Sequence, residues 1–246
     1  MKKIFKYGVG VFLASFIFSF LVTTFLMQKN FTQHLSKTPI VSPKPTLPKK
    51  ILIKGSIPYW DQKNALESFR KNVSAFNYVN LFWYYLGGDG SVEKYQYANE
   101  DPSIISFAHE NNVKVSAVIT NLPENSGKWD SKRVENVVFD KTLRQKHIEN
   151  IVNKLRELNF DGVIIDYELL RSNTRDEFSI FIQELSLALH KENKILIVVL
   201  HPKTGEKVNG EEISAYQDWE SLGNYADQLQ IMGYSEHSDE DSPGPV

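Results

Sequence analysis

From residue 51 onward, apolar runs alternate with segments of helical periodicity. Six runs have the length and the β-branched and aromatic content of buried strands, and most are followed by an amphipathic segment. The predicted strands are residues 51–60, 75–86, 114–121, 161–170, 194–202 and 227–235. The predicted helices are residues 61–72, 98–112, 140–158, 174–193 and 218–226, and residues 122–139 read as a polar loop.

Strands that are apolar on both faces and alternate with helices predict a parallel sheet covered by helices. Two architectures fit, a doubly wound open sheet and a (β/α)8 TIM barrel. No glycine-rich nucleotide fingerprint follows any strand. Polar and aromatic residues instead collect at the carboxyl ends of the strands, where a barrel builds its active site. The sequence therefore favours an α/β fold of the TIM-barrel type.

The predicted barrel is shorter than a complete one. A full barrel takes about 250 residues, whereas residues 51–246 supply six strands. We expect a barrel that is apparently truncated after the sixth strand. It follows that either the natural protein continues beyond Val246 or this chain is unstable in isolation, because open sheet edges favour aggregation.

The N-terminal segment predicts a membrane anchor. Residues 7–28 contain no charged residue, and a helix of roughly 20 apolar residues crosses a bilayer. Lys2, Lys3 and Lys6 precede the run and favour a cytoplasmic N-terminus. Residues 1–29 are therefore a membrane anchor or a signal peptide, followed by a Pro/Lys-rich linker at 30–50. The anchor is favoured for two reasons. The apolar run is longer than the apolar region of a signal peptide, which has about 7–15 residues, and no small-residue cleavage site follows the run.

This topology places residues 51–246 outside the cytoplasm, in a single-pass membrane protein or, with a cleaved signal, a secreted one. The first 60 residues hold nine lysines and no acidic residue, whereas the remainder carries a net charge of −11. An acidic body argues against nucleic-acid binding. The chain has no cysteine and no metal-binding histidine pattern, so we expect neither a disulfide nor a metal or other cofactor. The oligomeric state is left open.

The run NFDGVIIDYE, residues 159–168, places two carboxylates at the end of an apolar strand. Alternate residues of a strand share a face, so Ile164, Asp166 and Glu168 point one way. In a barrel this face is the interior, and Glu168 stands at the rim. Burial beside ionised Asp166 would raise the pKa of Glu168, which suits a general acid. The alternative is structural, with both carboxylates capping helices or pairing with Arg171 or Arg175.

The same run resembles the D-G-x-D-x-D-x-E signature of family 18 glycoside hydrolases, the chitinase and N-acetylglucosaminidase group. GSIPYW resembles the first strand of that family, LFWYYLGGDGSV its second strand and turn, and QIMGY its sixth strand. SEHSDEDSPGPV resembles a loop of the bacterial peptidoglycan-directed branch, the spore-cortex N-acetylglucosaminidases. The resemblance covers roughly residues 51–246.

The resemblance implies retaining hydrolysis beside an N-acetylglucosamine unit without an enzymic nucleophile, a known exception among glycosidases. Glu168 would protonate the leaving glycosidic oxygen, and Asp166 would orient the acetamide that attacks the anomeric carbon. Tyr234 would hydrogen-bond the acetamide carbonyl, and Met232 would wall the methyl group. Further candidates for sugar contacts are Tyr59, Trp83 and Asn121. For the two aromatic residues, Tyr59 and Trp83, the alternative is ordinary core packing. The implied substrate is a polysaccharide that contains N-acetylglucosamine, such as peptidoglycan or a chitin-like polymer.

The chain departs from the family pattern at several positions. Ile164 replaces the middle Asp of the motif, which in the family partners the next Asp and tunes proton traffic. Ser235 stands where the family usually has Asp or Asn, and residues 114–121 lack the S-x-G-G of typical chitinases. Two alternatives to an active enzyme therefore remain, a non-catalytic glycan-binding module on the same fold and an inactive fragment.

Overall fold

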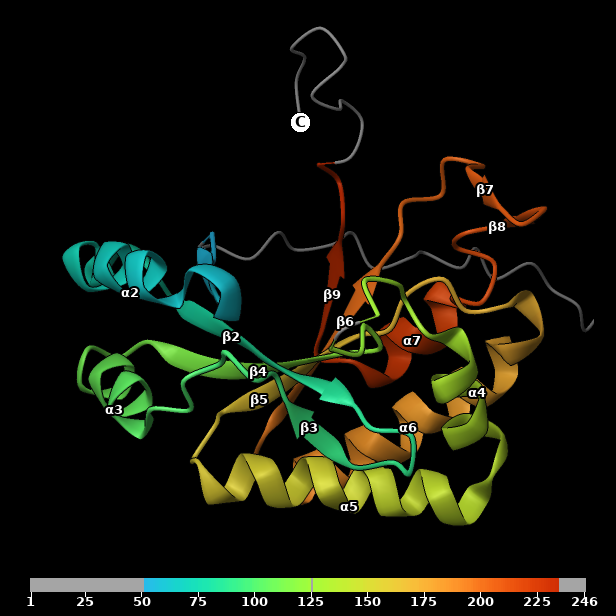
Figure 1. Ribbon diagram of the computed structural model, residues 1–246, viewed down its shortest axis with the longest axis horizontal. Coiled ribbons are helices and arrows are strands. Elements are labelled where there is room, and N and C mark those ends of the chain that lie inside the picture. The colour runs from blue at the N-terminus through green and yellow to red at the C-terminus, as the bar shows by residue number, and fades with distance from the viewer. Residues whose placement is uncertain (1–50, 125, 235–246) are drawn as a thin grey trace, which may run out of the picture. The chain divides into compact units, whose positions relative to one another are not determined.

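The computed structural model describes residues 51–124 and 126–234. In this part of the chain, helices cover the outer face of a curved parallel sheet (Figure 1). The parallel strands are β1 (Lys54–Pro58), β2 (Tyr78–Leu86), β4 (Lys114–Thr120), β5 (Gly162–Asp166), β6 (Ile195–Leu200) and β9 (Gln228–Ile231). Each of the six predicted strand segments contains one of these strands.

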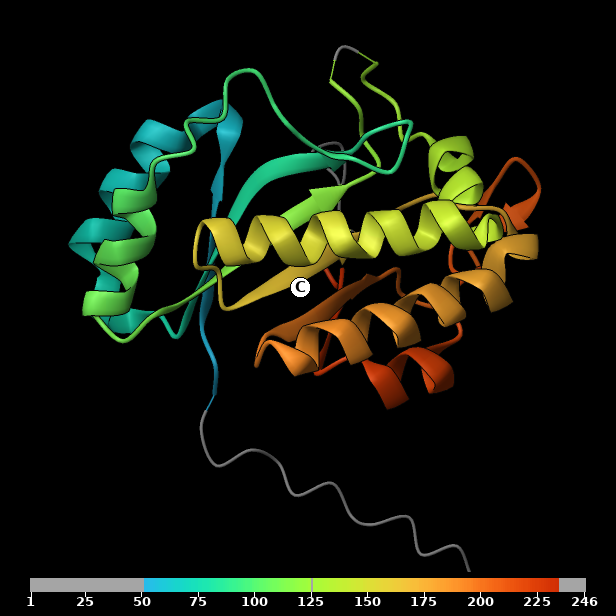
Figure 2. The ribbon, with the colours of Figure 1, turned by 90° about the horizontal axis from the view of Figure 1, so that it is seen from below.

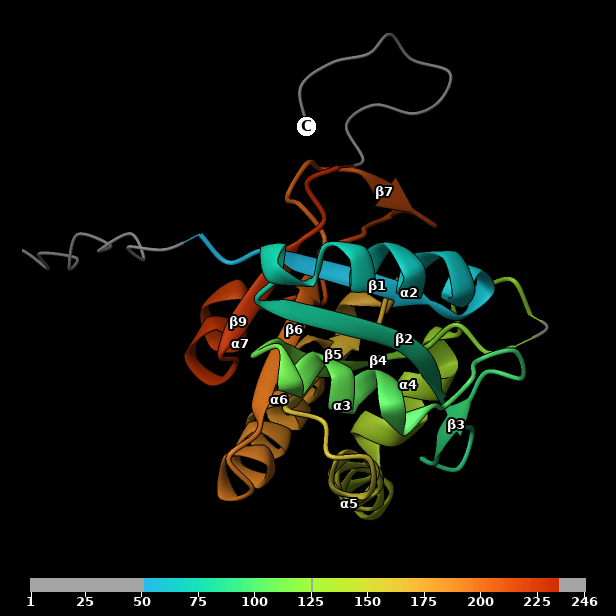
Figure 3. The same ribbon diagram turned by 90° about the vertical axis from the view of Figure 1, so that its left-hand side faces the viewer.

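The strands lie in the sheet in chain order, β1-β2-β4-β5-β6-β9, and every neighbouring pair is parallel. A doubly wound sheet reverses its strand order at a switch point, whereas a barrel does not. The sheet also curls: Gln228 Nε2 of β9 donates a hydrogen bond to Tyr78 Oη of β2 at 3.4 Å. Figure 3 shows the curve with the helices outside it. The described residues therefore form a half-barrel of six parallel strands.

Six helices of the described residues surround the sheet, several with Asp caps. They are α2 (Gln62–Lys71), α3 (Pro102–Glu110), α4 (Ser131–Phe139), α5 (Lys141–Glu157), α6 (Arg175–Lys191) and α7 (Trp219–Tyr225). Short 3-10 turns lie at η1 (Tyr59–Asp61), η2 (Val73–Ala75) and η3 (Ser172–Thr174). Asp101 accepts a hydrogen bond from the Ser103 N–H, with Pro102 at the first helical position, so α3 begins inside the segment 98–112 predicted to be helical.

The sheet separates two layers of apolar side chains. On the outer face, Val163, Ile165 and Tyr167 join the large core beneath the helices. Figure 2 shows α5 and α6 side by side across this face. On the inner face, a smaller cluster contains Val118, Ile164, Ile197 and Val199, with Phe82, Ile195 and Met232 packed against it. The predicted alternation of β5 between its two faces is confirmed.

The prediction of a polar loop at residues 122–139 was wrong for its second half. Helix α4 occupies Ser131–Phe139, and the Asp130 side chain accepts a hydrogen bond from the Arg133 N–H at its start. Val134, Val137 and Val138 are buried, and the helix packs against α5 and α6. Tertiary packing stabilises this short helix, which shows too few turns for its periodicity to be evident from sequence.

The sequence also did not predict two small antiparallel additions. Strand β3 (Val92–Lys94) pairs with the end of β2, and β7 (Lys207–Val208) pairs with β8 (Glu211–Glu212) in a hairpin between β6 and α7. Both extend from the carboxyl edge of the parallel sheet. Strands of two or three residues show no alternation that a sequence pattern can detect.

Within residues 51–124 and 126–234, no helix combines the length and apolarity needed to span a bilayer. The apolar run at 7–28, the linker at 30–50, Ser235 and Val246 lie outside the described residues.

Candidate active site

Strand β5 delivers the two carboxylates to the carboxyl edge of the sheet. At its start, Gly162 lies so close to β6 that a Cβ there would come 2.4 Å from the Ile195 carbonyl oxygen. This contact requires glycine and fixes the strand against its neighbour. Asp166 ends the strand opposite Thr120 of β4, and Glu168 follows two residues later.

Asp166 stands on the inner apolar cluster. Ile164 below it is 2% exposed and lies in register with Val118 on one side and Ile197 on the other. Burial raises the pKa of Asp166, whereas a hydrogen bond with Glu168 partly opposes this rise. Among the described residues, the buried Oδ1 of Asp166 has no hydrogen-bond partner. The site therefore lacks one donor, which an N–H of a bound ligand could supply.

Glu168 forms a hydrogen bond with Asp166. Burial is the main cause that raises the pKa of Glu168, and the charge of Asp166 and their hydrogen bond raise it further. Its side chain keeps 15% of its surface exposed. Both carboxyl groups therefore have raised pKa values, and the more accessible Glu168 is the better placed of the two to act as an acid.

The structural alternative for these carboxylates does not hold. Arg171 pairs with Glu135, and Arg175 pairs with Asp218 at 3.2 Å. Neither Asp166 nor Glu168 caps a helix of the described residues. Both carboxylates are therefore available for chemistry.

Asn121 fixes the backbone at Glu168. Its Nδ2 donates to the Glu168 carbonyl at 2.9 Å, and its Oδ1 accepts from the Glu168 N–H at 2.8 Å. Asn121 is fully buried, so the structure gives it this backbone role and not the expected sugar contact. On either side, Tyr216 Oη donates to the Tyr167 carbonyl at 2.6 Å, and Leu169 has a left-handed φ of 56°. A non-glycine residue in this conformation persists only where its surroundings fix it.

Met232 and Tyr234 reach the pair from the end of β9. Met232 packs against the inner apolar cluster, and its N–H donates to the Leu200 carbonyl at 3.0 Å. Tyr234 is 67% exposed, and partial burial followed by the charges of Asp166 and Glu168 raises the pKa of its hydroxyl. The structure thus brings Asp166, Glu168, Met232 and Tyr234 together.

An aromatic group lies beside the carboxylates at the ends of β1 and β2. Tyr59 stacks on Tyr95 with centroids 4.1 Å apart, and Tyr95 Oη donates to the Leu122 carbonyl at 2.6 Å. Trp60 and Tyr97 are 65% and 74% exposed and line a hollow of about 480 Å³ with Tyr59. Aromatic faces of this kind suit stacking against sugar rings. No sequence pattern indicated Tyr95, which lies in a loop without periodicity.

Trp83 does not belong to this group, and its predicted sugar contact is corrected. The register of β2 against β4 shifts between Phe82 and Tyr84, which marks a bulge. Phe82 lies on the inner face opposite Val118, so the alternation of the strand places Trp83 on the outer face. There it is fully buried and packs edge-on against Phe160. Beyond the bulge, Tyr85 takes the place opposite Thr120 on the inner face.

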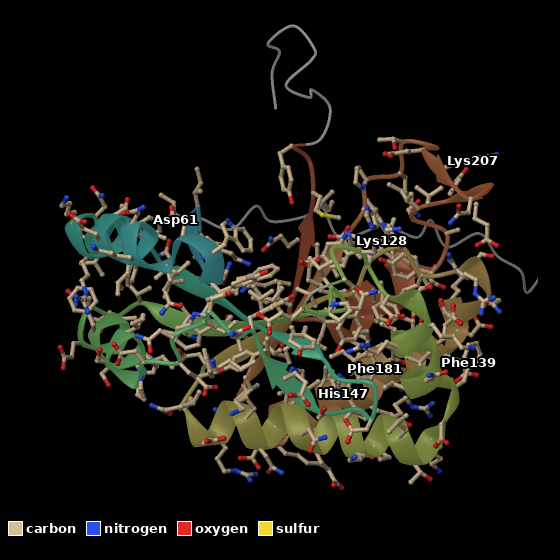
Figure 4. The ribbon with its side chains drawn as sticks, viewed as in Figure 1. Asp61, Lys128, Phe139, His147, Phe181 and Lys207 are labelled. Carbon is tan, nitrogen blue, oxygen red and sulfur yellow. The ribbon has the colours of Figure 1, made fainter. Side chains whose placement is uncertain are left out.

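A second hollow, of about 280 Å³, lies directly after Glu168. Leu169, Leu170 and Arg171 line it with Trp129 and the β7–β8 hairpin. Figure 4 shows Lys128 and Lys207 on this loop side of the sheet and His147 and Phe181 on the helix side. Polar side chains and hollows therefore border the carboxylates at the carboxyl edge.

Among the residues that the structure describes, no three His, Cys, Asp or Glu side chains are grouped so as to hold a metal ion.

Comparison with known proteins gives the family that the sequence resembles. The model of "Glycosyl hydrolases family 18" matches residues 56–245. The chain is 28% identical over 142 residues to an uncharacterized glycosylase, YvbX, of Bacillus subtilis (strain 168), covering 58% of this chain and 41% of that protein. It is 23% identical over 172 residues to a cortical fragment-lytic enzyme of the same organism, covering 70% and 38%.

Among solved structures, a chitinase from Chromobacterium violaceum ATCC 12472 matches with a TM-score of 0.68 and 26% identity, over 80% of this chain and 60% of that one. The chain spans about two fifths of the length of the curated relatives it matches. The match to the family model covers more than half of this chain and includes every residue of the carboxylate site. The chain therefore belongs to glycosyl hydrolases family 18.

Proposed function

We propose that this glycosidase hydrolyses β-linked N-acetylglucosamine glycans, in peptidoglycan or a chitin-like cell-surface polymer, with retention of configuration. The observation that carries the proposal is the carboxyl pair, in which burial and Asp166 raise the pKa of Glu168 and, among the described residues, Asp166 Oδ1 has no donor. The first feature suits a general acid, and the second suits an acceptor for an acetamide N–H.

In the first step, Glu168 gives its proton to the glycosidic oxygen and the bond from the anomeric carbon to that oxygen breaks. The carbonyl oxygen of the substrate's 2-acetamido group forms a new bond to the anomeric carbon, giving an oxazolinium ion. Asp166 accepts the acetamide N–H and stabilises the positive charge. Its buried Oδ1 can turn toward the substrate because the χ2 torsion of Asp is soft.

In the second step, ionised Glu168 takes a proton from water, and the water oxygen bonds to the anomeric carbon. The bond between that carbon and the acetamide oxygen breaks, which restores the acetamide and the protonated acid. Two displacements at one carbon leave its configuration unchanged. Tyr234 and Met232 would contact the carbonyl and the methyl of the acetamide from the end of β9.

The bound glycan would extend over the two hollows at the carboxyl edge. Exposed Trp60 and Tyr97 offer stacking faces on one side, and the hollow between Trp129 and the β7–β8 hairpin offers a second surface. Relatives named as a cortical fragment-lytic enzyme and a chitinase support the choice of polymers to test.

Release of reducing ends from purified peptidoglycan and from chitin oligomers tests this function. We expect turnover by the full chain and a loss of roughly 10²–10⁴-fold in kcat for Glu168→Gln, with glycan binding kept. Glu192→Gln is the matched control, because Glu192 is paired with Arg156 beyond the end of α6. Equal turnover by wild type and Glu168→Gln would reject the general acid, and binding without turnover by wild type would indicate a glycan-binding module.

The site of action is a further part of the proposal. The apolar run at 7–28 and the lysines before it support a single-pass anchor with the glycosidase domain outside the cytoplasm. Sequencing the N-terminus of the exported protein tests this placement. An intact N-terminus in the membrane fraction would agree with an anchor, whereas a mature N-terminus beyond residue 30 would indicate a cleaved signal and a secreted protein.

A further inference from the structure

One buried histidine faces the catalytic carboxyl group from the neighbouring strand. His201 directly follows β6 and is 6% exposed. Its Nε2 lies 3.7 Å from Glu168 Oε2, and no other group among the described residues forms a hydrogen bond with that nitrogen. A buried ring nitrogen without a hydrogen-bond partner costs free energy. We therefore expect a second arrangement of the side chains in which this nitrogen is hydrogen-bonded.

The imidazole is held in place from behind. The backbone N–H of His201 donates to Gln217 Oε1 at 2.8 Å. Gln217 Nε2 in turn donates to the Val199 carbonyl at 3.0 Å and to Tyr216 Oη at 2.9 Å. The His201 and Tyr216 rings meet edge to face, with centroids 6.4 Å apart. With the backbone of His201 held and its ring packed against Tyr216, a small movement of the Glu168 side chain is enough to close a hydrogen bond.

We propose that His201 is a positioning residue that donates an Nε2–H hydrogen bond to Glu168 when that carboxyl group is ionised. The inference rests on the proposed function, in which Glu168 is ionised between the two displacements. His201 would also give the carboxyl pair a polar partner. The inner cluster offers none, because the side chain of Ile164 below Asp166 cannot form a hydrogen bond.

The charge state of His201 agrees with donation from a neutral ring. Burial lowers the pKa of His201, and the charge of Glu206 opposes this effect. The imidazole is therefore neutral at pH 7, with one proton available for Nε2. The other titratable groups around His201 and Glu168 are Asp166 of β5, Glu206 before β7, Tyr216 before α7 and Tyr234 after β9.

The donor has a defined effect on titration. A hydrogen bond to the ionised form favours that form and lowers the pKa of Glu168. Removing the donor should therefore raise the pKa of Glu168 above its wild-type value. The expected rise is about one pH unit, because hydrogen bonds to charged groups change such equilibria by roughly tenfold or more.

The experiment is a ¹³C NMR titration of the full chain carrying glutamate labelled at the side-chain carboxyl, with Glu168→Gln used to assign the Glu168 resonance. His201→Phe keeps a ring and removes the donor, and we expect its Glu168 midpoint to be about one pH unit higher. His201→Gln keeps an N–H at a similar distance, and we expect a midpoint near that of wild type. In the turnover assay, the basic limb of the pH profile should shift in the same direction.

An unchanged Glu168 midpoint in a cooperatively folded His201→Phe protein would overturn the inference. His201→Leu takes its place if that variant does not fold. The wild-type ring gives an independent readout, because the ¹⁵N resonance of its Nε2 should follow the Glu168 titration and lose this response in Glu168→Gln. The titration does not depend on turnover. An inactive wild type would therefore reject the proposed function, whereas the Glu168 titration midpoints of wild type and the His201 variants would still decide the role of His201.

Discussion

At the scale of single residues, the chemistry of the site follows from what surrounds one carboxyl pair. Asp166 rests on an apolar layer to which Ile164 contributes a nearly fully buried side chain. Burial is the first cause of both raised pKa values, and this layer contributes an apolar floor to it. An isoleucine at position 164 therefore belongs to a dry layer that raises the pKa of both carboxyl groups.

Restoring the acidic residue of the family motif should harm this protein. In Ile164→Asp, a carboxyl group would enter the layer formed by Val118, Ile197 and Val199 with no polar partner from that cluster. We expect a loss of about 2–5 kcal/mol in the free energy of unfolding and no gain in turnover. Urea denaturation measures this, with Ile164→Val as the control at about 1 kcal/mol. A stable and more active Ile164→Asp protein would show that the layer is not dry.

The raised pKa of Glu168 also predicts how stability depends on pH. Because the pKa of Glu168 is higher in the folded state, folding favours its protonated form. Protonated Glu168 therefore contributes to the free energy of unfolding at low pH, and this contribution is lost as pH rises through the folded-state pKa. In Glu168→Gln, the free-energy cost of ionising a buried side chain at high pH is absent, and the amide of the new glutamine can still donate to Asp166. We expect the Tm of Glu168→Gln to exceed that of wild type by a few degrees at pH 8, with no difference at pH 4. A difference that is constant from pH 4 to pH 8 would contradict the shift.

At the scale of elements, the segment after β5 is as important as the strand. Asn121 at the end of β4 satisfies both backbone groups of Glu168. The left-handed Leu169 and the bond from Tyr216 to the Tyr167 carbonyl fix the residues on either side. The acid is therefore presented by a segment between β5 and η3 whose backbone is hydrogen-bonded by side chains from two other parts of the chain.

Removing the Asn121 side chain should loosen this turn. In Asn121→Ala, the N–H and the carbonyl of Glu168 lose their partners, and we expect about 2 kcal/mol less stability and a kcat at least tenfold lower. Asn150→Ala is the control, because Asn150 also donates to a backbone carbonyl, that of Gly90, on the helix side of the sheet. If both variants kept the wild-type kcat, Asn121 would have no role in placing Glu168.

The same scale shows where sequence patterns succeed and where they fail. The alternation of Val163, Ile164 and Ile165 predicted both faces of β5, because the strand period is a local property. The bulge after Phe82 depends on the pairing of β2 with β4, so no pattern within β2 reveals that Tyr84 faces outward and Tyr85 stands opposite Thr120. The backbone bonds of Asn121 and the approach of His201 likewise join separate strands.

At the scale of the whole molecule, the parallel half-barrel could be predicted and much of its site could not. Strand order follows chain order, so alternating strand and helix patterns were sufficient for the architecture. Asp166 and Glu168 share one strand, which made their pairing evident. Tyr95 follows β3 and His201 follows β6, and only the pairing of strands in the sheet brings both residues to the edge where the carboxylates lie.

The measurement that tests the proposed mechanism most directly is the anomeric configuration of the first product. The full chain would be mixed with a β-linked N-acetylglucosamine oligomer and followed by ¹H NMR before mutarotation equilibrates the new reducing end. Attack by the substrate's own acetamide, assisted by Asp166 and Glu168, predicts that the β-anomer appears first and that the fully deacetylated oligomer is not cleaved. An α-anomer as the first product, or equal cleavage of the deacetylated oligomer, would contradict it.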